Sequence, residues 1–440
     1  MSIEQLYSIF RCHPTITTDS RNCPEGSIFF ALKGENFNGN AYASNALQQG
    51  SAFAVIDDNQ YYNPDDSRMI LVDDVLTTLQ QLARHHRRQL GTPIIGITGT
   101  NGKTTTKELI ATVLKRKYNI LYTQGNFNNH IGVPKTLLQL TADHELAVVE
   151  MGANHPGEIH DLVNIAEPNY GIITNVGKAH LLGFGSFEGV IRTKGELYDF
   201  MRSKSGIVFI NNDNPHLNSI AQGLQLVRYG QNTSESNAIE GRLLSCAPFL
   251  KFEWQSKTDK QKHTVQTQLI GAYNLDNALA AIAIGSHFGV SADDICAALE
   301  EYVPSNNRSQ LKQTEKNTLI IDAYNANPTS MAAALDNFAL MEAPHKMCIL
   351  GDMKELGESS QEEHIKVLKK IIGSKLEQVW LVGEEFKKAV DTYSPATEGI
   401  TTFADSNEAI TKIKEGEVTG QTILIKGSNS TRLITLVEHL

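Results

Sequence analysis

Short hydrophobic runs alternate with amphipathic segments along most of the chain, which is the pattern of an α/β protein. The runs in the middle carry few polar residues, so we expect them to be buried strands of a parallel sheet. Between the first two runs, residues 104–117 place Leu109, Ile110, Val113 and Leu114 on one face of a predicted helix. The middle runs are PIIGITG (93–99), NILYT (119–123), LAVVEMG (146–152), YGIITNV (170–176) and GIVFINN (206–212).

The pattern changes twice along the chain, and 440 residues are too many for one ordinary core. Before residue 88, short strand-like runs broken by Gly and Asn end in a helical segment at 76–90 and a turn at 91–93. After residue 307 the strand–helix alternation returns with TLIID, KMCILGD, QVWLVG and TILIKG. We therefore expect a small α+β N-terminal domain (1–88), a central parallel-sheet domain (89–306) and a C-terminal Rossmann-like α/β domain (307–440).

Composition excludes several classes of protein. With 41% hydrophobic and 20% charged residues the chain is typical of a soluble globular protein, and its net charge of −10 disfavours nucleic-acid partners. The five cysteines show no CxxC spacing, so neither a disulfide framework nor a zinc site is expected. The start MSIEQLYSIF is unlike a signal peptide, and the apolar run at 278–284 is too short to span a bilayer. We expect a cytoplasmic protein with no membrane insertion.

The stretch GITGTNGKTTTKE (96–108) is the strongest functional signal. It is not a strict Walker A motif, because Ile97 stands where that motif has its first glycine. Backbone N–H groups at the start of the following helix could still hold phosphates, with Lys103 on the outer phosphates and the Thr104 hydroxyl on Mg2+. A plain glycine turn with a solvated lysine is the alternative, and the strand–turn–helix context favours the nucleotide site.

Two strand ends offer candidate magnesium ligands, because parallel sheets place sites at the carboxyl ends of their strands. Glu150 closes LAVVE, and His180 follows YGIITNVGKAH. Magnesium prefers oxygen ligands, so Glu150 is the better candidate from chemistry alone. Lys194, by itself, reads as a solvated lysine on a helix. These residues predict a magnesium–nucleotide enzyme and leave its substrate open.

Eight segments together resemble the Mur ligases of peptidoglycan synthesis. The resemblance runs in the same order from about residue 15 to residue 435, and TTDSRNCPEGSIFFALKGENFNGN resembles the UDP-sugar-binding domain of that family. The segments are GTNGKT, VVEMGANHPGEI, TNVGKAHL, KGE, GAYNLDNALAA, DAYNANPTSM, LGDMKELGE and ILIKGSNS.

The resemblance implies a reaction, and it is greatest to the members that add the terminal dipeptide. ATP would phosphorylate the carboxylate of UDP-N-acetylmuramoyl-tripeptide, and the amine of D-alanyl-D-alanine would then attack the acyl phosphate. A carboxylate is a poor electrophile, so such activation is needed. Phosphoryl transfer depends mainly on positioning and charge neutralisation. The resemblance also implies a monomer acting in cell-wall biogenesis, with closure of the third domain completing the site.

The resemblance also implies roles for residues around ATP and Mg2+. Lys103, Lys194 and His180 would be catalytic, and Lys194 would carry a carbamate that supports a second metal. Metal ligands would be Thr104, Glu150 and His180. The ATP-binding set would be Thr98, Gly99, Thr100, Asn101, Gly102, Lys103, Thr104, Asn277, Arg308 and Asp322.

Further positions match the substrate side of the family. The substrate-binding set would be Thr18, Asp19, Ser20, Arg21, Lys33 and Gly34 on the uridine-diphosphate side, and Tyr324, Asn325 and Asn327 at the domain junction. Three positions depart from the commoner pattern and affect recognition rather than the reaction. Asn38 stands in place of an aspartate, Ile321 replaces the first of two aspartates, and GSNS (427–430) replaces an arginine-bearing GSR.

Three alternatives stay open from the sequence. A sibling ligase would add a different amino acid, such as the third residue or a glutamate. A phosphate-loop kinase would stop at the acyl phosphate or phosphorylate a sugar, and would need no amine. A non-catalytic nucleotide-binding protein is disfavoured by the presence of Lys103, Glu150, His180 and Lys194 together.

Overall fold

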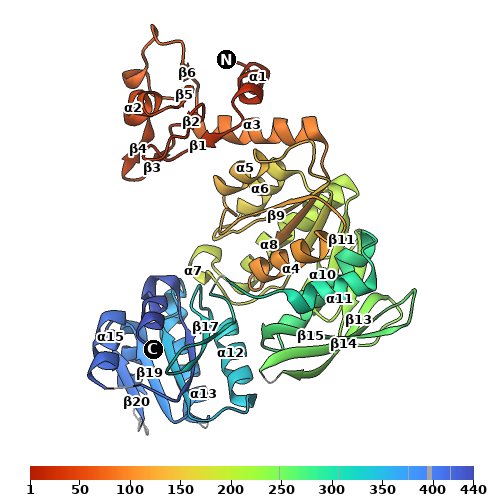
Figure 1. Cartoon of the computed structure of the whole chain (residues 1–440), viewed down its shortest axis with the longest axis vertical. Helices are drawn as coiled ribbons and strands as arrows, with labels where there is room; N and C mark the ends of the chain where they lie inside the picture. Colours follow the sequence, from red (N-terminus) through yellow and green to blue (C-terminus); the bar gives the residue numbers. More distant parts are fainter. Residues whose placement is uncertain (247, 306, 375, 394–398, 417) are drawn as a thin grey trace.

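Three sheets, each with its own helices, follow one another along the long axis of the molecule (Figure 1). The computed structural model describes residues 1–246, 248–305, 307–374, 376–393, 399–416 and 418–440. Within these ranges no helix has the length and apolar character needed to cross a bilayer. The predicted three-part α/β architecture is confirmed.

The N-terminal part is built on four parallel strands in the order β1-β2-β5-β6. The strands are β1 (Ile16–Thr17), β2 (Ile28–Phe30), β5 (Phe53–Ile56) and β6 (Met69–Leu71), with a separate antiparallel hairpin of β3 (Lys33–Gly34) and β4 (Phe37–Asn38). The helices are α1 (Ile3–Cys12), α2 (Ala43–Gln48) and α3 (Val75–Leu90), with 3-10 turns η1 (Gly39–Tyr42) and η2 (Asn59–Tyr61).

The central sheet has nine strands in the order β15-β14-β13-β12-β11-β10-β7-β9-β8. The five predicted runs form β7 (Ile94–Thr98), β8 (Ile120–Tyr122), β9 (Leu146–Glu150), β10 (Tyr170–Ile173) and β11 (Ile207–Asn211), all parallel. The sheet then continues through β12 (Gln225–Gly230), β13 (Asn237–Cys246), β14 (Phe249–Ser256) and β15 (Lys262–Ile270), and the last two pairings are antiparallel. These four strands were not predicted.

Helices cover both faces of the central sheet. On one face α4, α10 and α11 pack over a core that includes Ile95, Leu109 and Ile282. On the other face α5, α6 and α8 share a core with α1 and α3, so apolar packing is continuous from the N-terminal part into the central one. The bounds are α4 (Lys103–Leu114), α5 (Gly132–Leu137), α6 (Glu158–Ala166), α7 (Leu181–Phe184), α8 (Phe187–Lys204), α9 (Pro215–Ser219), α10 (Asn274–His287) and α11 (Ala292–Glu301).

The C-terminal sheet has six strands in the order β16-β17-β21-β18-β19-β20, and only β16 is antiparallel. The four predicted runs form β17 (Thr318–Asp322), β18 (Lys346–Gly351), β19 (Gln378–Val382) and β21 (Thr422–Lys426); the edges are β16 (Gln310–Gln313) and β20 (Ile400–Phe403). The helices are α12 (Pro328–Leu340), α13 (Ser360–Ile372), α14 (Glu384–Thr392) and α15 (Ser406–Glu415), with 3-10 turns η3 (Gly357–Ser359), η4 (Asn429–Thr431) and η5 (Leu433–Glu438).

The predicted domain limits remain predictions. Helix α3 runs across the first limit, at residue 88, and links the N-terminal and central sheets (Figure 1). Residue 306, at the second limit, lies outside the described residues.

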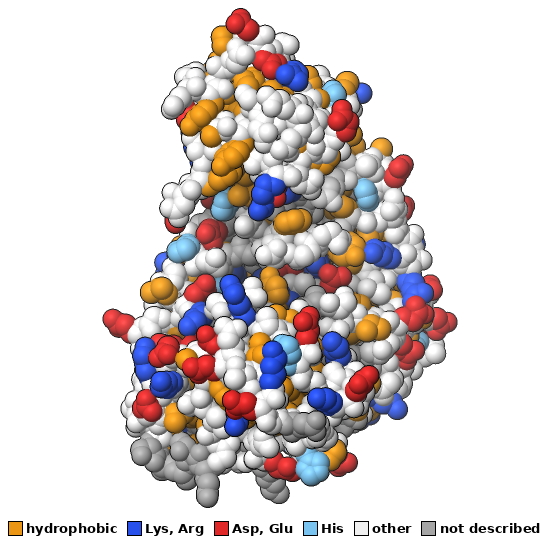
Figure 2. All heavy atoms as spheres, turned by 60° about the vertical axis from the view of Figure 1, so that its left-hand side comes forward, with side chains coloured by type: hydrophobic (Ala, Val, Ile, Leu, Met, Phe, Trp, Pro, Cys, Tyr) orange, Lys and Arg blue, Asp and Glu red, His pale blue; other side chains and the backbone are white. Residues whose placement is uncertain are grey.

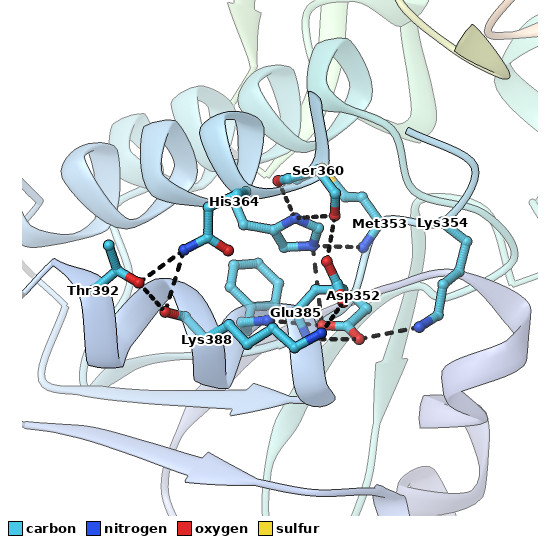
Figure 3. Close-up of polar contacts among 10 residues, drawn as sticks. Asp352, Met353, Lys354, Ser360, His364, Glu385, Lys388 and Thr392 are labelled. Atoms are coloured by element: carbon cyan, nitrogen blue, oxygen red, sulfur yellow. Dashed lines mark hydrogen bonds and ion pairs between the residues drawn. The ribbon is translucent and has the colours of Figure 1, made fainter. Parts of the chain in front are cut away.

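A buried carboxylate, Asp352, fixes the loop that follows β18 (Figure 3). Its oxygens accept the backbone N–H groups of Glu385 (3.2 Å) and Phe386 (3.0 Å) at the start of α14, where the helix dipole favours negative charge. The Lys354 ammonium lies 3.1 Å from the same side chain. The carboxylate can approach because Gly383 has no side chain: its φ is +122°, and an added Cβ would lie 2.3 Å from Asp352 Cγ.

We predict that Gly383→Ala lowers the free energy of unfolding of the C-terminal sheet by about 2–4 kcal/mol, because it adds both backbone strain and a clash with a held side chain. Chemical denaturation would be followed by the fluorescence of Trp380 in a chain carrying Trp254→Phe. Gly416→Ala is the control, since nothing lies within 4 Å of its added Cβ, and it should change stability by less than about 1 kcal/mol. Equal stability of the two variants would contradict the account of Asp352.

Candidate active site

A cavity of about 960 Å³ lies where the three parts of the chain meet. It is lined by Leu76 and Gln80 of α3, by the loop after β7, and by residues that follow β17. Figure 2 shows the hollowed face of the molecule between the N-terminal part and the rest. The predicted site residues that line this cavity are Thr100, Asn101, Gly102, Lys103, Glu150, His180, Asn277, Arg308, Asp322, Tyr324 and Asn325.

The loop between β7 and α4 is tightly packed against its neighbours. Gly99 (φ +144°) and Gly102 (φ +77°) have backbone conformations that suit glycine. An added Cβ would lie 2.0 Å from Thr174 Oγ1 at Gly99 and 2.6 Å from Asn277 Oδ1 at Gly102. Both neighbours are polar side chains, one at the end of β10 and one on α10. Their close approach to the two glycines fixes the backbone path of the loop.

Hydrogen bonds from the segment after β10 hold the same loop. The N–H of Thr100 donates to the carbonyl of Asn175 (2.9 Å), and the N–H of Asn101 donates to the Asn175 side-chain oxygen (3.0 Å). The Thr174 hydroxyl donates to the Asn101 carbonyl (2.7 Å). The N-terminus of α4 is thereby left facing the cavity, with its dipole suited to an anion.

Lys103 folds back over the loop. Its ammonium donates to the carbonyls of Gly99 (2.8 Å) and Thr100 (3.1 Å). Burial lowers the pKa of Lys103 to about 8; the nearby Arg308 acts in the same direction, and Glu150 opposes it. A bound phosphate would restore the charged form of this lysine.

Glu150 has one engaged and one free carboxylate oxygen. Its Oε1 accepts from the Thr104 hydroxyl (3.2 Å) and from the Asn128 amide (2.9 Å). Its Oε2 is buried and has no hydrogen-bond partner among the described residues. Burying a carboxylate oxygen without a partner costs free energy unless a cation binds to it. Carboxylate oxygens are preferred ligands of Mg2+. No cluster of three or more His, Cys, Asp or Glu side chains able to hold a metal occurs in the described ranges.

His180 is partly buried and Lys194 is fully buried. His180 Nδ1 pairs with the Glu355 carboxylate of the C-terminal part rather than with Thr104 or Glu150. Burial lowers the pKa of His180, and Lys103 and Lys194 add to the effect, although Glu355 opposes it. Lys194 is 2% exposed, donates to the carbonyl of Ala153 (3.3 Å), and lies 5.2 Å from the centre of the Phe184 ring. Burial lowers its pKa well below the usual range, and the charge of Lys103 acts in the same direction.

The expectation that Lys194 alone reads as a solvated surface lysine is wrong, because the sequence pattern could not show what packs over it.

The C-terminal residues form a polar wall opposite the loop. The Lys426 ammonium donates to Asp322 (2.6 Å), and the Arg308 guanidinium lies 3.9 Å from the centre of the Tyr324 ring. Asn327 does not line the cavity, but its amide donates to the Asn101 side chain (2.7 Å) and so ties α12 to the phosphate loop.

The six predicted N-terminal residues do not line this cavity. Asp19 and Arg21 form an exposed ion pair, and Lys33 pairs with Asp57 at 2.8 Å. Thr18 accepts from the Lys135 ammonium of α5 (3.4 Å), which joins the N-terminal and central parts. Asn38 caps the turn at Asn40 with its side-chain oxygen (3.1 Å). The uridine-diphosphate roles of the six residues therefore stay predictions.

Sequence reasoning missed several contributors. Thr174 and Asn175 end a predicted strand beside the loop, so the strand-end rule that selected Glu150 could have selected them too. Asn128 contacts the site from the loop after β8 and was not selected. Glu355 lies in the segment LGDMKELGE that carries the resemblance, but the segment alone did not show that its carboxylate contacts His180.

Comparison with known proteins gives matches along the chain. Residues 14–87 match the Mur ligase family catalytic domain, residues 97–285 the Mur ligase middle domain, and residues 307–429 the Mur ligase glutamate ligase domain. The chain is 35% identical to the UDP-N-acetylmuramoyl-tripeptide--D-alanyl-D-alanine ligase of Bacillus subtilis (strain 168), over 97% of this chain and 92% of that protein. It is also 35% identical to the ligase of the same name from Escherichia coli (strain K12), over 97% and 93%.

Solved structures agree with these matches. The crystal structure of MurF from Acinetobacter baumannii superposes with a TM-score of 0.85 at 31% identity, covering 96% of this chain and 92% of that one. MurF ligase from Thermotoga maritima in complex with ADP gives a TM-score of 0.84 at 25% identity, covering 97% and 96%.

We predict that ATP binding takes up a proton in mildly alkaline solution. Below pH 8 Lys103 is charged in both states, whereas above pH 8 the free protein has lost the proton that bound phosphates restore. Uptake should be about half a proton at pH 8 and approach one near pH 9, with affinity falling as the pH rises. Calorimetry in two buffers of different ionisation enthalpy measures it. Lys103→Arg, which stays charged, should show no uptake, and equal uptake by both proteins would exclude Lys103 as the group.

Proposed function

The chain belongs to the Mur ligase family, and from that premise we infer that it is an ATP-dependent ligase. It joins D-alanyl-D-alanine to UDP-N-acetylmuramoyl-tripeptide through an acyl-phosphate intermediate, in peptidoglycan precursor synthesis. The observation that carries this assignment is near full-length similarity to ligases of that name, combined with a phosphate-binding loop that opens into a cavity shared by all three parts of the chain.

The chemistry needs two steps in one place. The tripeptide carboxylate attacks the γ-phosphorus of ATP, the bond to the bridging oxygen breaks, and ADP leaves. The dipeptide amine then attacks the acyl carbon, loses a proton, and expels inorganic phosphate. Lys103 and the N–H groups at the start of α4 would neutralise the phosphate charge during the first step. The reacting groups would lie at the loop inside the cavity, where restricted access of water would protect the acyl phosphate.

Magnesium is proposed to bind beside the loop. Glu150 and Thr104 fit this role, since a buried oxygen of Glu150 lies unpaired next to the Thr104 hydroxyl. His180 is proposed as a ligand of a second ion. Such ions would neutralise phosphate charge. We also place the enzyme in the cytoplasm as a monomer, and the five free cysteines suit a reducing compartment.

Substrate positions follow from the walls of the cavity. We propose that the phosphates of ATP lie on residues 98–104. Asn277, Arg308 and Asp322 would be near the adenine, γ-phosphate and ribose respectively. The Arg308 guanidinium makes a cation–π contact with the Tyr324 ring, and the Lys426 ammonium orients the Asp322 carboxylate. The acceptor would run from Thr18–Arg21, Lys33 and Gly34, past Leu76 and Gln80, to the loop. Tyr324, Asn325 and Asn327 would line the junction.

We predict that phosphate release from ATP and magnesium requires both co-substrates, with a pentapeptide product visible by mass spectrometry. Each co-substrate is left out in turn, and the tripeptide is tested with either diamino acid in its third position. Release that needs a different amine would point to a sibling ligase, and release without any amine would point to a kinase. Lys103→Ala should abolish turnover; unchanged activity would remove the loop from the mechanism.

We propose that Lys194 reacts with carbon dioxide to form a carbamate. The neutral amine attacks carbon dioxide, a nitrogen–carbon bond forms, and one proton is released. Burial favours this reaction because it lowers the pKa of Lys194 and so disfavours the charged ammonium relative to the reactive amine. The resulting anion would lie near Lys103, whose charge already acts on Lys194.

We predict a carbamate signal in carbon-13 NMR spectra of the protein in labelled bicarbonate, and its loss in Lys194→Gln. Turnover should fall by about tenfold or more in Lys194→Gln. Lys204→Gln, at the exposed end of the same helix, is the matched control and should keep both signal and activity. Full activity without bicarbonate, together with no carbamate signal, would exclude the carbamate of Lys194.

A further inference from the structure

We propose that Glu355 of the C-terminal part is a positioning residue that fixes the tautomer and orientation of His180 in the central part. The proposal rests on the catalytic role proposed for His180. It adds a residue outside the predicted site and a reason why the C-terminal part must be docked for the imidazole to act.

Two contacts join Glu355 to the segment that carries His180. Its carboxylate Oε2 pairs with His180 Nδ1, and its backbone carbonyl accepts the N–H of Leu182 at 3.2 Å. Together, the side-chain contact and the main-chain contact of Glu355 define how far it lies from the imidazole of His180 and how it is oriented toward it. The imidazole is therefore held by a specific arrangement rather than by charge alone.

Both partners adopt a backbone conformation that is rare for residues with a side chain. His180 has φ +50° and Glu355 has φ +63°. Such conformations persist where surrounding structure enforces them, and they gather at functional sites. His180 takes this conformation immediately before α7, and Glu355 takes it in the loop after β18.

The loop that presents Glu355 is anchored in the buried network of Figure 3. Asp352 is held by the start of α14 and by Lys354, as described above. The N–H of Met353 donates to His364 Nε2 (3.1 Å), and His364 Nδ1 is 2.7 Å from the carbonyl of Ser360. Asp352 and Met353 are thus fixed to α14 and α13, and Leu356 after Glu355 is buried. Glu355 projects from a rigid support.

The chemical consequence concerns the second ring nitrogen. A carboxylate accepts a proton from Nδ1–H, so the neutral imidazole keeps its lone pair on Nε2. His180 lines the cavity, and Nε2 has no hydrogen-bond partner among the described residues. That nitrogen is then available to a metal ion or a proton. Without Glu355 the ring could exchange tautomers and rotate.

Because the two residues lie in loops of different parts of the chain, the tautomer of His180 depends on docking of the C-terminal part. The docking is supported by Asn327 on Asn101 (2.7 Å) and by Lys178 near Glu363 (3.4 Å). Through Glu355, the tautomer of His180 therefore depends on whether the C-terminal part is docked on the central part. The reaction would start only in the docked arrangement.

The test uses the full chain labelled with nitrogen-15 at histidine, without metal or nucleotide. His180 is assigned by its loss in His180→Gln among the 14 histidines. Long-range nitrogen–proton spectra show which ring nitrogen carries the proton. We expect Nδ1–H in the wild type and an Nε2–H or mixed state in Glu355→Ala. Glu358→Ala, an exposed acid three positions away, should keep the wild-type state.

Kinetics complete the test. Glu355→Ala should lower kcat by about tenfold and leave the KM for ATP within about twofold, and Glu355→Asp should restore part of kcat. The melting temperature should match that of Glu358→Ala. An unchanged tautomer in Glu355→Ala, or an equal kcat loss in Glu358→Ala, would overturn the proposal. The tautomer is read without turnover, so a wild type that forms no pentapeptide would refute the proposed function and not this geometry.

Discussion

The loop between β7 and α4 has no space for a side chain at Gly99 or Gly102, and the surrounding structure is arranged around that crowding. Thr174 fills the space beside the first glycine and Asn277 the space beside the second. Asn327 then reaches the loop from a third direction by bonding to Asn101. These contacts come from the end of β10, from α10 and from α12, so a short turn determines where three distant elements must lie.

This crowding explains the variant loop sequence. A strict Walker A loop needs an earlier glycine, but here Ile97 is a fully buried residue of β7 that packs in the core of the central sheet. The turn after it is held by hydrogen bonds to Asn175. The position of Glu150 follows from the same sheet, because β9 is the direct neighbour of β7.

The buried parallel strands could be predicted because each is a continuous apolar run. The strands β12 to β15 are not continuous apolar runs and were missed for that reason. In β14 the buried residues alternate with Lys251, Glu253 and Gln255, a pattern that itself indicates a strand covered on one face. In the site, Glu150 followed from the rule on strand ends. Burial of Lys194 and the pairing of His180 with Glu355 did not, since both depend on contacts between residues distant in sequence.

Helix α3 links the N-terminal sheet to the central one, and it is continuous across the junction. Its 16 residues make a rod of about 24 Å. Its N-cap Asp74 and first turn lie near the N-terminal sheet, and its C-terminal arginines bond to Glu167 of the central part. A continuous helix of this kind holds its two ends at a fixed distance from each other. Because it is bonded at both ends, the N-terminal and central sheets are held at a fixed separation, and any ligand that contacts both must match that length.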